Sequence, residues 1–238
     1  MPHTSQGSDR LGALAGLAFA LLFFFSVFVV DPLRGATDQE VQEWWTDGGM
    51  RRDAIISMAL MLLAGPCFLV FASRLRARLR ESNTEGTGHD VVFGAGMIFV
   101  AMLTLTAIVR GVIAQAVRFG DEPLPGLDTL RFATSLSDAA FGLGAMPFVT
   151  LAVAAASVVI LQTGAMPRWV GWFGLGVTTL SAIAIAMLIG PFAIPLTVLW
   201  VFSVSYQFFR SRSSHMAAAS TRQPAVPEQV QPLAGRAQ

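Results

Sequence analysis

Residues 54–80, AIISMALMLLAGPCFLVFASRLRARLR, decide the fold of this 238-residue chain. The first twenty residues of the stretch carry no charge, and twenty helical residues at about 1.5 Å each cross a hydrocarbon core of roughly 30 Å. The remaining seven residues contain four arginines, at positions 74, 76, 78 and 80. Positive charge beside a spanning helix stays on the cytoplasmic side, so the sequence predicts a membrane helix whose carboxyl end points inward.

The composition of the whole chain agrees with a membrane protein. Hydrophobic residues make up 54% of the sequence and charged residues 13%, whereas a soluble domain carries about a quarter charged residues. All sixteen basic residues are arginine, which excludes Schiff-base chemistry on a lysine and therefore a retinal-binding pump. The single cysteine, Cys67, excludes an intramolecular disulfide framework and a thiolate metal cluster. The net charge of +1 gives no general attraction to nucleic acid.

The same length argument, applied to each apolar run, predicts an all-α polytopic bundle of six transmembrane helices, with spans at about 11–30, 54–73, 91–114, 139–161, 169–189 and 191–209. The last two spans come from one apolar region of 41 residues, 169–209, which as a single helix would reach about 60 Å. It must therefore fold back, and Gly190-Pro191 is the natural turn. The pair Gly12 and Gly16, four residues apart, would let another helix approach the first span closely.

The arginines beside the spans set the predicted topology. Eight lie on the side of the 74–80 cluster and five on the other, so both termini are expected in the cytoplasm and the protein in the plasma membrane. Residues 1–10 form a cytoplasmic N-terminus. Residues 210–238, rich in alanine, glutamine, serine and proline, are expected to form a disordered cytoplasmic tail.

The first outer loop contains a predicted short helix. Thr37-Asp38-Gln39-Glu40 has the pattern of a capping box, in which Thr37 is the N-cap and Glu40 the third helical residue. We expect this helix to run to about Thr46 and to end at Gly48-Gly49, where a glycine can adopt the left-handed conformation.

One face of the loop helix carries Val41, Trp44 and Trp45 at spacings of three and four residues. A short helix with two tryptophans on one side belongs at the membrane interface or over the mouth of the bundle. Two interpretations stay open. The tryptophans anchor the loop in an aromatic belt, or they form a lid over a cavity.

The candidate binding residues cluster at the outer end of the third and fourth spans. Arg110 comes nineteen residues after Val91, which begins the third span, and therefore lies near the outer boundary. Arg118 follows on the same helical stripe, and Asp138 directly precedes the fourth span, so Arg110 and Asp138 are expected to pair. The pair either locks two helices together or forms, with Arg118, an outer-leaflet site for an anionic group in which Asp138 orients the arginines.

The sequence contains few residues that could support catalysis, nucleotide binding or metal binding. We find no H-E-x-x-H, G-x-S-x-G or G-x-x-x-x-G-K-[ST] motif, and we predict neither a metal site nor a cofactor. His89 is expected to be a solvated loop residue. The hydroxyls of the spans, such as Thr106, Thr150 and Ser157, are expected to bond to backbone carbonyls or to a neighbouring helix.

Several features together resemble a family of actinobacterial six-helix integral membrane proteins of uncharacterised function. These features are the acidic outer loop with WW, the RLRARLR end of the second span, the MPRWVGWFG start of the fifth and the LWVFSVS of the sixth. The resemblance covers about residues 11–210 and implies no activity.

Three classes of function stay open. The first is a membrane protein, either a transporter or a sensor, that binds a small molecule or a lipid in an outer-leaflet cavity near Trp44, Trp45, Arg110, Arg118 and Asp138. The second is a structural or accessory subunit that packs against a partner membrane protein or a second copy of itself. The third is a membrane enzyme that uses boundary carboxylates. Membrane lipid is the expected partner, and nucleic acid is not.

Overall fold

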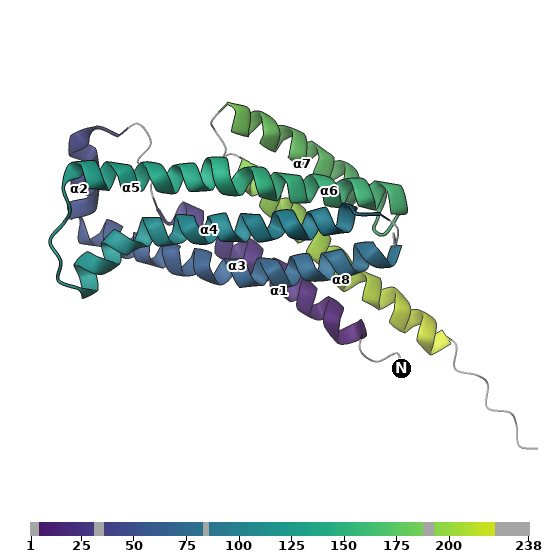
Figure 1. The fold of residues 1–238 in the computed structure, drawn as a ribbon. Coiled ribbons are helices and arrows are strands. Elements are labelled where there is room, and N and C mark those ends of the chain that lie inside the picture. The colour runs from purple at the N-terminus through teal and green to yellow at the C-terminus, as the bar shows by residue number, and fades with distance from the viewer. Residues whose placement is uncertain (1–4, 31–35, 83–85, 188–192, 222–238) are drawn as a thin grey trace, which may run out of the picture.

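The computed structural model describes residues 5–30, 36–82, 86–187 and 193–221, with side chains from residue 10 to residue 210 of these ranges. Throughout these ranges the secondary structure is helical, without a strand (Figure 1). Five helical segments are long and apolar enough to cross a membrane: Arg10–Phe28, Gly48–Ser82, Gly88–Phe119, Leu127–Thr163 and Arg168–Ala186. The all-α prediction is therefore confirmed, and the protein is a multi-pass membrane protein.

The elements follow in the order α1 (Ser5–Phe28), α2 (Asp38–Thr46), α3 (Gly48–Ser82), α4 (Gly88–Phe119), α5 (Leu127–Ala139), η1 (Ala140–Ala145), α6 (Met146–Thr163), α7 (Arg168–Ala186) and α8 (Ile194–Thr221). The long helices generally extend beyond the predicted spans. The predicted turn at Gly190-Pro191 lies outside the described residues, and so does 222–238 of the predicted tail. Helix α8 continues to Thr221, past residue 210 where the tail was expected to begin.

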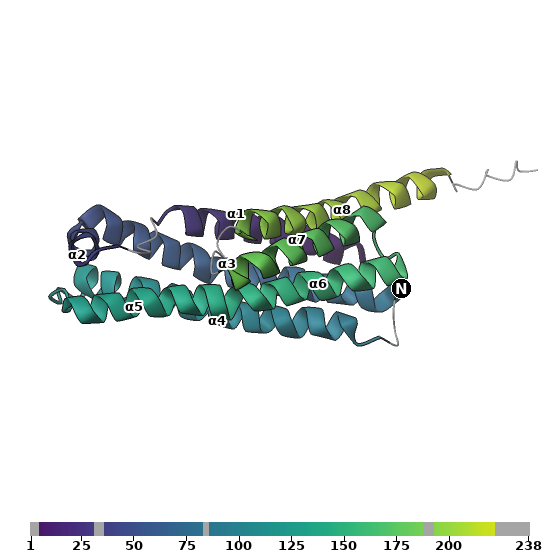
Figure 2. The same cartoon turned by 90° about the horizontal axis from the view of Figure 1, so that it is seen from above.

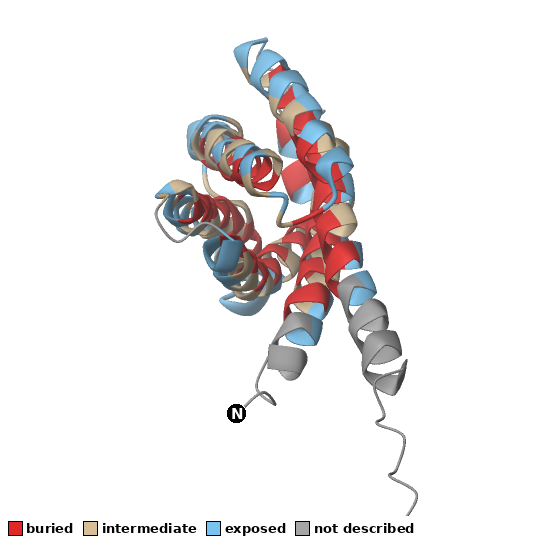
Figure 3. Cartoon of the chain, turned by 90° about the vertical axis from the view of Figure 1, so that its right-hand side faces the viewer, coloured by how far each residue is buried: buried red, intermediate tan, exposed pale blue. Residues whose placement is uncertain are grey.

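The long helices form a ring. Each of α1, α3, α4, α6 and α7 packs against the next along the chain, and α8 closes the ring by packing against both α7 and α1. In the end-on view of Figure 3 the buried faces of the helices turn toward one another. The exposed faces carry many large apolar side chains, as lipid-facing surfaces do.

Three helical columns are longer than the others. Helices α3 and α4 contain 35 and 32 residues, which correspond to lengths of about 52 and 48 Å, and α5, η1 and α6 follow one another as a single column. At the end of the bundle where α2 lies, these columns extend past α1 and α7 (Figures 1 and 2). After the predicted topology, we call this the outer end and the opposite one the inner end.

Close helix contacts occur at glycine. A Cβ atom at Gly16 of α1 would lie 2.6 Å from a ring carbon of Phe71 in α3 and nearer still to the Ser205 hydroxyl of α8. A Cβ atom at Gly12 would lie 2.8 Å from the Cβ of Arg74. The prediction that Gly12 and Gly16 admit a neighbouring helix is thus confirmed.

A π-helical turn, η1, joins α5 to α6, in which Pro147 is the second residue. A proline has no N–H to donate, and its ring clashes with the carbonyl four residues earlier, here that of Leu143. The wider turn accommodates this: the N–H of Met146 donates to the carbonyl of Phe141, five residues back. The column therefore has a local change of helical pitch at Pro147.

The buried apolar residues form two separate clusters. The larger one, which we call the membrane cluster, includes residues from all the long helices and is centred on Phe19, Phe23, Phe68 and Phe99. The smaller one, which we call the outer cluster, lies at the outer end and consists of Val41, Trp44, Trp45, Ala54, Ala114 and Leu130.

Helix α2 has the predicted beginning but a different end. The capping box of Thr37 and Glu40 is confirmed, and so is the end of the helix at Thr46. The prediction of a left-handed glycine at Gly48-Gly49 is wrong, because Asp47 instead adopts an extended conformation (φ −69°, ψ 121°) and α3 begins at Gly48. Asp47 accepts hydrogen bonds from the N–H groups of Gly49 and Met50 and so caps the start of α3.

Candidate functional site

Arg110 of α4 and Asp138 of α5 lie together at the outer end, as their predicted depths require. The nearest guanidinium nitrogen, Nη2, lies 4.0 Å from Oδ1 of Asp138. This is an ion-pair distance, well beyond the 2.7–2.9 Å of a charge-assisted hydrogen bond. The Arg110 side chain is 19% exposed and that of Asp138 31%. Both charged side chains are thus largely, but not fully, buried.

Four buried hydroxyl residues lie at the same level of the bundle and bond to backbone carbonyls. Ser57 of α3 donates to the carbonyl of Ser26 in α1 at 2.6 Å. Ser137 of α5 approaches the carbonyl of Thr106 in α4 at 3.5 Å. The Thr106 and Ser26 hydroxyls donate within their own helices. We call Ser26, Ser57, Thr106 and Ser137, together with Arg110 and Asp138, the polar layer.

The polar layer separates the two apolar clusters. Along α4, Leu103 and Ala107 belong to the membrane cluster, with Thr106 between them, and Arg110 of the polar layer and Ala114 of the outer cluster follow. Along α3 the order is reversed with the chain direction, from Ala54 of the outer cluster through Ser57 to Met61 of the membrane cluster. An ionisable pair therefore lies between apolar material on both sides.

Trp44 and Trp45 are buried beneath α2 and do not face outward. They are 9% and 3% exposed, and their rings meet edge to face with centroids 4.9 Å apart. They pack against Ala54, Ala114 and Leu130, at the outer ends of α3, α4 and α5. This burial does not fit the aromatic-belt interpretation, in which indoles face the headgroups. Helix α2 lies over the ends of α3, α4 and α5, and a cavity beneath it stays a prediction.

Both indole N–H groups are buried, and neither has a hydrogen-bond partner among the residues that the structure describes. A buried indole N–H usually has a partner, because an unsatisfied buried donor costs about 1–3 kcal/mol. Two such donors, at Trp44 and Trp45, lie in the cluster directly beyond the polar layer.

Contacts at its N-terminus hold α2 on the bundle. The carboxylate of Glu40 accepts hydrogen bonds from the backbone N–H of Thr37 at 2.6 Å and from its hydroxyl at 2.9 Å. Arg131 of α5 pairs with Asp38 and also donates to the carbonyl of Ala36 at 3.3 Å. The N–H of Thr37, followed by its hydroxyl, holds the pKa of the Glu40 carboxyl below its ordinary value of 4.5.

At the C-terminus of α2, Arg51 holds the chain in place. Its guanidinium donates to the carbonyls of Trp45 and Thr46 at 2.6 and 2.8 Å. These bonds satisfy carbonyls that the helix end leaves without an intrahelical partner, and they explain why no left-handed glycine is required.

Arg118, the third predicted anion ligand, lies apart from the pair. It is eight residues beyond Arg110 on α4, about 12 Å along the helix. Its side chain is exposed, and its guanidinium lies over the ring of Phe119, 5.8 Å from the centroid. The structure thus brings together Arg110 with Asp138 and Trp44 with Trp45, and places Arg118 farther out.

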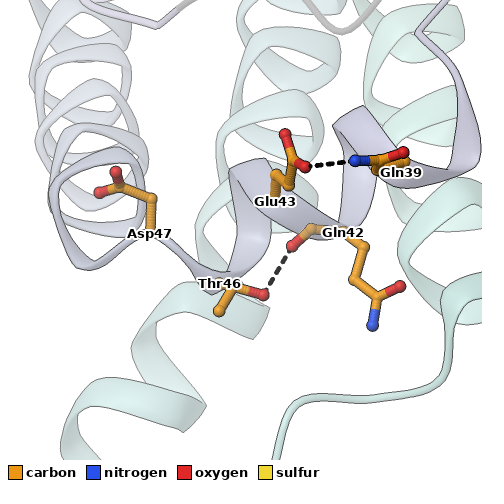
Figure 4. A pocket seen from close by; sticks show the side chains of 5 residues that line it. All are labelled: Gln39, Gln42, Glu43, Thr46 and Asp47. Atoms are coloured by element: carbon orange, nitrogen blue, oxygen red, sulfur yellow. Dashed lines mark hydrogen bonds between the residues drawn. The ribbon is translucent and has the colours of Figure 1, made fainter.

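The outward face of α2 has a shallow hollow of about 390 Å³ (Figure 4). Its lining residues are Gln39, Gln42, Glu43, Thr46 and Asp47. Gln39 donates to the Glu43 carboxylate at 2.8 Å, and Thr46 donates to the carbonyl of Gln42 at 2.7 Å. These residues lie on the side of α2 opposite the two indoles, so the hollow is separate from the polar layer.

His89 is not the solvated loop residue that we expected. Helix α4 begins at Gly88, which packs against Val159, and His89 in its first turn is 5% exposed. The next residue, Asp90, pairs with Arg76 of α3 at 2.6 Å and so joins the first turn of α4 to α3. In the described ranges, no three His, Cys, Asp or Glu side chains come close enough to hold a metal ion.

The predicted role of the span hydroxyls, to bond to backbone carbonyls, is confirmed for the three residues named above. Thr106, Thr150 and Ser157 each donate to the carbonyl four residues earlier, at 2.7–2.9 Å. Sequence reasoning missed the contributions of Ser26, Ser57 and Ser137 to the polar layer. The sequence offered only a weak signal for the first two. Ser26 lies about one turn before the end of the first predicted span, and Ser57 about one turn after the start of the second.

Comparisons of the chain with protein-family models, with curated proteins and with solved structures found no match.

Proposed function

We propose that this protein is a six-span plasma-membrane protein that binds an anionic small molecule or lipid at its outer boundary, in transport or in sensing. Helix α8 supplies the sixth span, α2 lies at the outer surface, and both termini are cytoplasmic. The arginine cluster at 74–80 supports this orientation, because arginines beside spans are retained in the cytoplasm.

The observation that carries the proposal is the polar layer between two apolar clusters. An ionisable residue at the edge of the hydrocarbon is costly, and it points to a binding function by default. A half-buried ion pair is weak evidence for a stabilising role, because apolar residues of similar size often stabilise as well. Arg110 and Asp138 are therefore better explained by a ligand than by packing alone.

The residues have distinct roles in the proposed site. Arg110 binds the anionic group, because a guanidinium presents its donors in a planar fork that matches a carboxylate or a phosphate. Asp138 holds the guanidinium in orientation. Arg118 attracts the anion from farther out, and the indole N–H groups of Trp44 and Trp45 are donors within the lid.

The test compares a charged with an uncharged probe of the same chain length. Protein in phosphatidylcholine nanodiscs is titrated with myristate and, separately, with tetradecanol, and thermal unfolding is followed. We expect myristate to raise the unfolding temperature of the wild type and tetradecanol not to do so.

The variant Arg110→Gln/Asp138→Asn removes both charges without leaving one unpaired, and it should abolish the response to myristate. The matched control is Arg52→Gln/Asp53→Asn, which removes another ion pair of the outer end, 3.4 Å apart, whose carboxylate is about as exposed as that of Asp138 and whose arginine is far more exposed than Arg110. An equal myristate response in all three proteins would contradict the proposal.

A further inference from the structure

Helix α2 lies across the outer end of the bundle and is attached to it through a small apolar surface (Figure 1). Its buried side chains are Val41, Trp44 and Trp45. They belong to the outer cluster, which is separate from the membrane cluster. An element that is attached by few buried residues, apart from the main core, can open while the rest of the molecule stays folded.

The position of α2 on the bundle leaves two buried donors unsatisfied. The part of the chain that the structure describes offers no acceptor to the indole N–H of Trp44 or of Trp45. Each N–H would bond to water if α2 moved away from the bundle. Burial of the two rings stabilises the closed position, whereas the two unsatisfied donors oppose it. Opening of α2 therefore costs less free energy than the burial of two tryptophans alone would suggest.

The C-terminal end of α2 is joined directly to α3. A single residue, Asp47, separates the two helices. Arg51 of α3 donates to the carbonyls of Trp45 and Thr46, so its bonds lie close to this junction. A residue between two helices can absorb the backbone rotation of a hinge, and Asp47 is the residue in that position.

The N-terminal end of α2 is attached to α5 through side chains. Arg131 of α5 pairs with Asp38 in the first turn of α2 and donates to the carbonyl of Ala36. The side chain of Arg131 is 43% exposed and that of Asp38 is 68% exposed. An ion pair so exposed to water contributes little to stability. We call the Arg131–Asp38 pair the latch, because it must break when this end of α2 moves away from α5.

The two indoles lie on the outward side of the polar layer. Ala114, against which they pack, is one turn farther out than Arg110 on the same side of α4. On α3, Ala54 of the outer cluster is likewise one turn farther out than Ser57. Movement of α2 away from α5 would therefore uncover the outward approach to Arg110.

We propose that α2 is a hinged lid, which pivots at Asp47 and admits the anion to Arg110 when the latch breaks. This inference rests on the proposed function, because it concerns access to the same site. The ligand enters and leaves while α2 is open and is retained while α2 is closed. The latch therefore controls the rates of binding and release and has little effect on the affinity.

Exchange of the indole protons measures the opening of the lid directly. The full chain, labelled with nitrogen-15 tryptophan and held in phosphatidylcholine nanodiscs, is transferred to deuterated buffer, and its five indole signals are followed. The variant Asp38→Asn/Arg131→Gln removes both charges of the latch. We expect the signals of Trp44 and Trp45 to exchange about two- to fivefold faster in this variant, the change that loss of an exposed ion pair gives.

The experiment has an internal reference and a matched control. The indole of Trp200 is buried in the membrane cluster, also without a partner among the described residues, and its exchange should not change. The control variant, Arg76→Gln/Asp90→Asn, removes an ion pair at the inner end whose side chains are 38% and 52% exposed, close to those of the latch. It should leave the exchange of the lid indoles as in the wild type. Acceleration in both variants, or in neither, would overturn the lid.

The kinetics of ligand binding distinguish a lid from a binding element. Myristate is passed over the same nanodiscs after immobilisation, and the signal of empty nanodiscs is subtracted. We expect the association and dissociation rate constants of the latch variant both to rise about two- to fivefold, so that Kd is nearly unchanged. Faster dissociation alone would make the latch part of the binding site. Unchanged rates would mean that myristate reaches the site from the bilayer, and either result would overturn the lid.

The lid and the outer anion site can fail separately. Arg110 and Asp138 are intact in all these variants. A wild type that does not respond to myristate would contradict the outer site and, with it, the lid. A wild type that binds myristate, together with a latch variant that matches it in indole exchange and in both rate constants, would contradict the lid alone.

Discussion

The membrane cluster combines phenylalanine packing with helices that approach one another closely at glycine, whereas the outer cluster is built around two tryptophans. At Gly174 of α7, an added Cβ would lie within 2.4 Å of Trp200 in α8 and nearer still to Ser157 in α6. In the outer cluster, Trp44 and Trp45 fill the space between helix ends. Close backbone approach and large side chains are two different ways to exclude voids.

The difference follows from the solvent around each cluster. Lipid tails are as apolar as leucine, so burial inside the membrane gives no hydrophobic gain and close packing must hold the helices together. The outer cluster belongs to helix ends that extend past α1 and α7; on the proposed topology these ends lie in water, where burying an aromatic side chain is strongly favourable. On the proposed topology, the polar layer lies at the boundary between the lipid tails and water.

Truncation of one aromatic residue in each cluster tests this contrast and has the largest expected effect. Trp45→Ala should cost about 3–5 kcal/mol, the range for a buried aromatic residue in water. Phe99→Ala, at 0% exposure in the membrane cluster, should cost less, because only the cavity contributes when lipid replaces water. Hydrogen exchange of α2 and denaturant unfolding in micelles measure the two losses. Equal losses of stability in the two variants would contradict the proposal that water surrounds one cluster and lipid the other.

Substitution of a close-contact glycine has the next largest effect. Gly174→Ala should cost about 1–3 kcal/mol, because the methyl group has no room between Ser157 and Trp200. Gly176→Ala, two residues away in the same helix, is the control, since a Cβ there would meet nothing within 4 Å. It should be neutral or stabilising by up to about 1 kcal/mol. Unfolding in micelles that ranks the two variants the other way would contradict close packing at α7.

Loss of the α2 cap is a smaller and local change. Thr37→Ala removes the hydroxyl that accepts from the N–H of Glu40, and such a loss typically costs about 1 kcal/mol. Faster hydrogen exchange should be confined to residues 38–46 and the outer cluster. Thr37→Ser keeps the hydroxyl and should exchange like the wild type. Faster exchange throughout the spans would show that the outer cluster does not open separately.

The smallest expected effect is a pH dependence of α2. Because its hydrogen bonds with Thr37 lower the pKa of Glu40 in the folded state, this contribution is fully present above the unfolded value of 4.5 and is lost as the pH falls through the lower folded value. Hydrogen exchange of α2 should therefore accelerate as the pH is lowered from 6 toward 3, after correction for intrinsic rates. Glu40→Gln should flatten this dependence. An identical pH profile in the two proteins would rule out the capping carboxylate as its cause.

Local rules and fixed helix geometry made part of the structure predictable. The start of α2 follows from four adjacent residues, Thr37 to Glu40, whose side chains and backbone groups satisfy one another. Arg110 and Asp138 could be matched in depth because the helical rise per residue is constant. The first prediction depends only on residues within one helical turn. The second depends only on the number of residues along each of two helices.

The missed features depend on contacts between elements. The end of α2 is set by Arg51, which reaches back to the carbonyls of Trp45 and Thr46. His89 is buried because α4 begins at Gly88, ahead of the expected start at Val91, and the Arg76–Asp90 pair lies in the same first turn. Ser57 belongs to the polar layer only because α1 lies beside α3, and a single serine in an apolar run does not reveal that neighbour.

The central claim is that Arg110 and Asp138 form a binding unit for an anion and are not merely a link between α4 and α5. The most direct measurement is made on the charge-swapped variant Arg110→Asp/Asp138→Arg, with unfolding temperature and myristate response recorded on the same samples in phosphatidylcholine nanodiscs. We expect the swap to regain the stability that Arg110→Asp alone loses, because the ion pair is restored, while the myristate response stays absent because the positive charge has moved to α5. A swapped protein that regains both the stability and the full response would contradict the account.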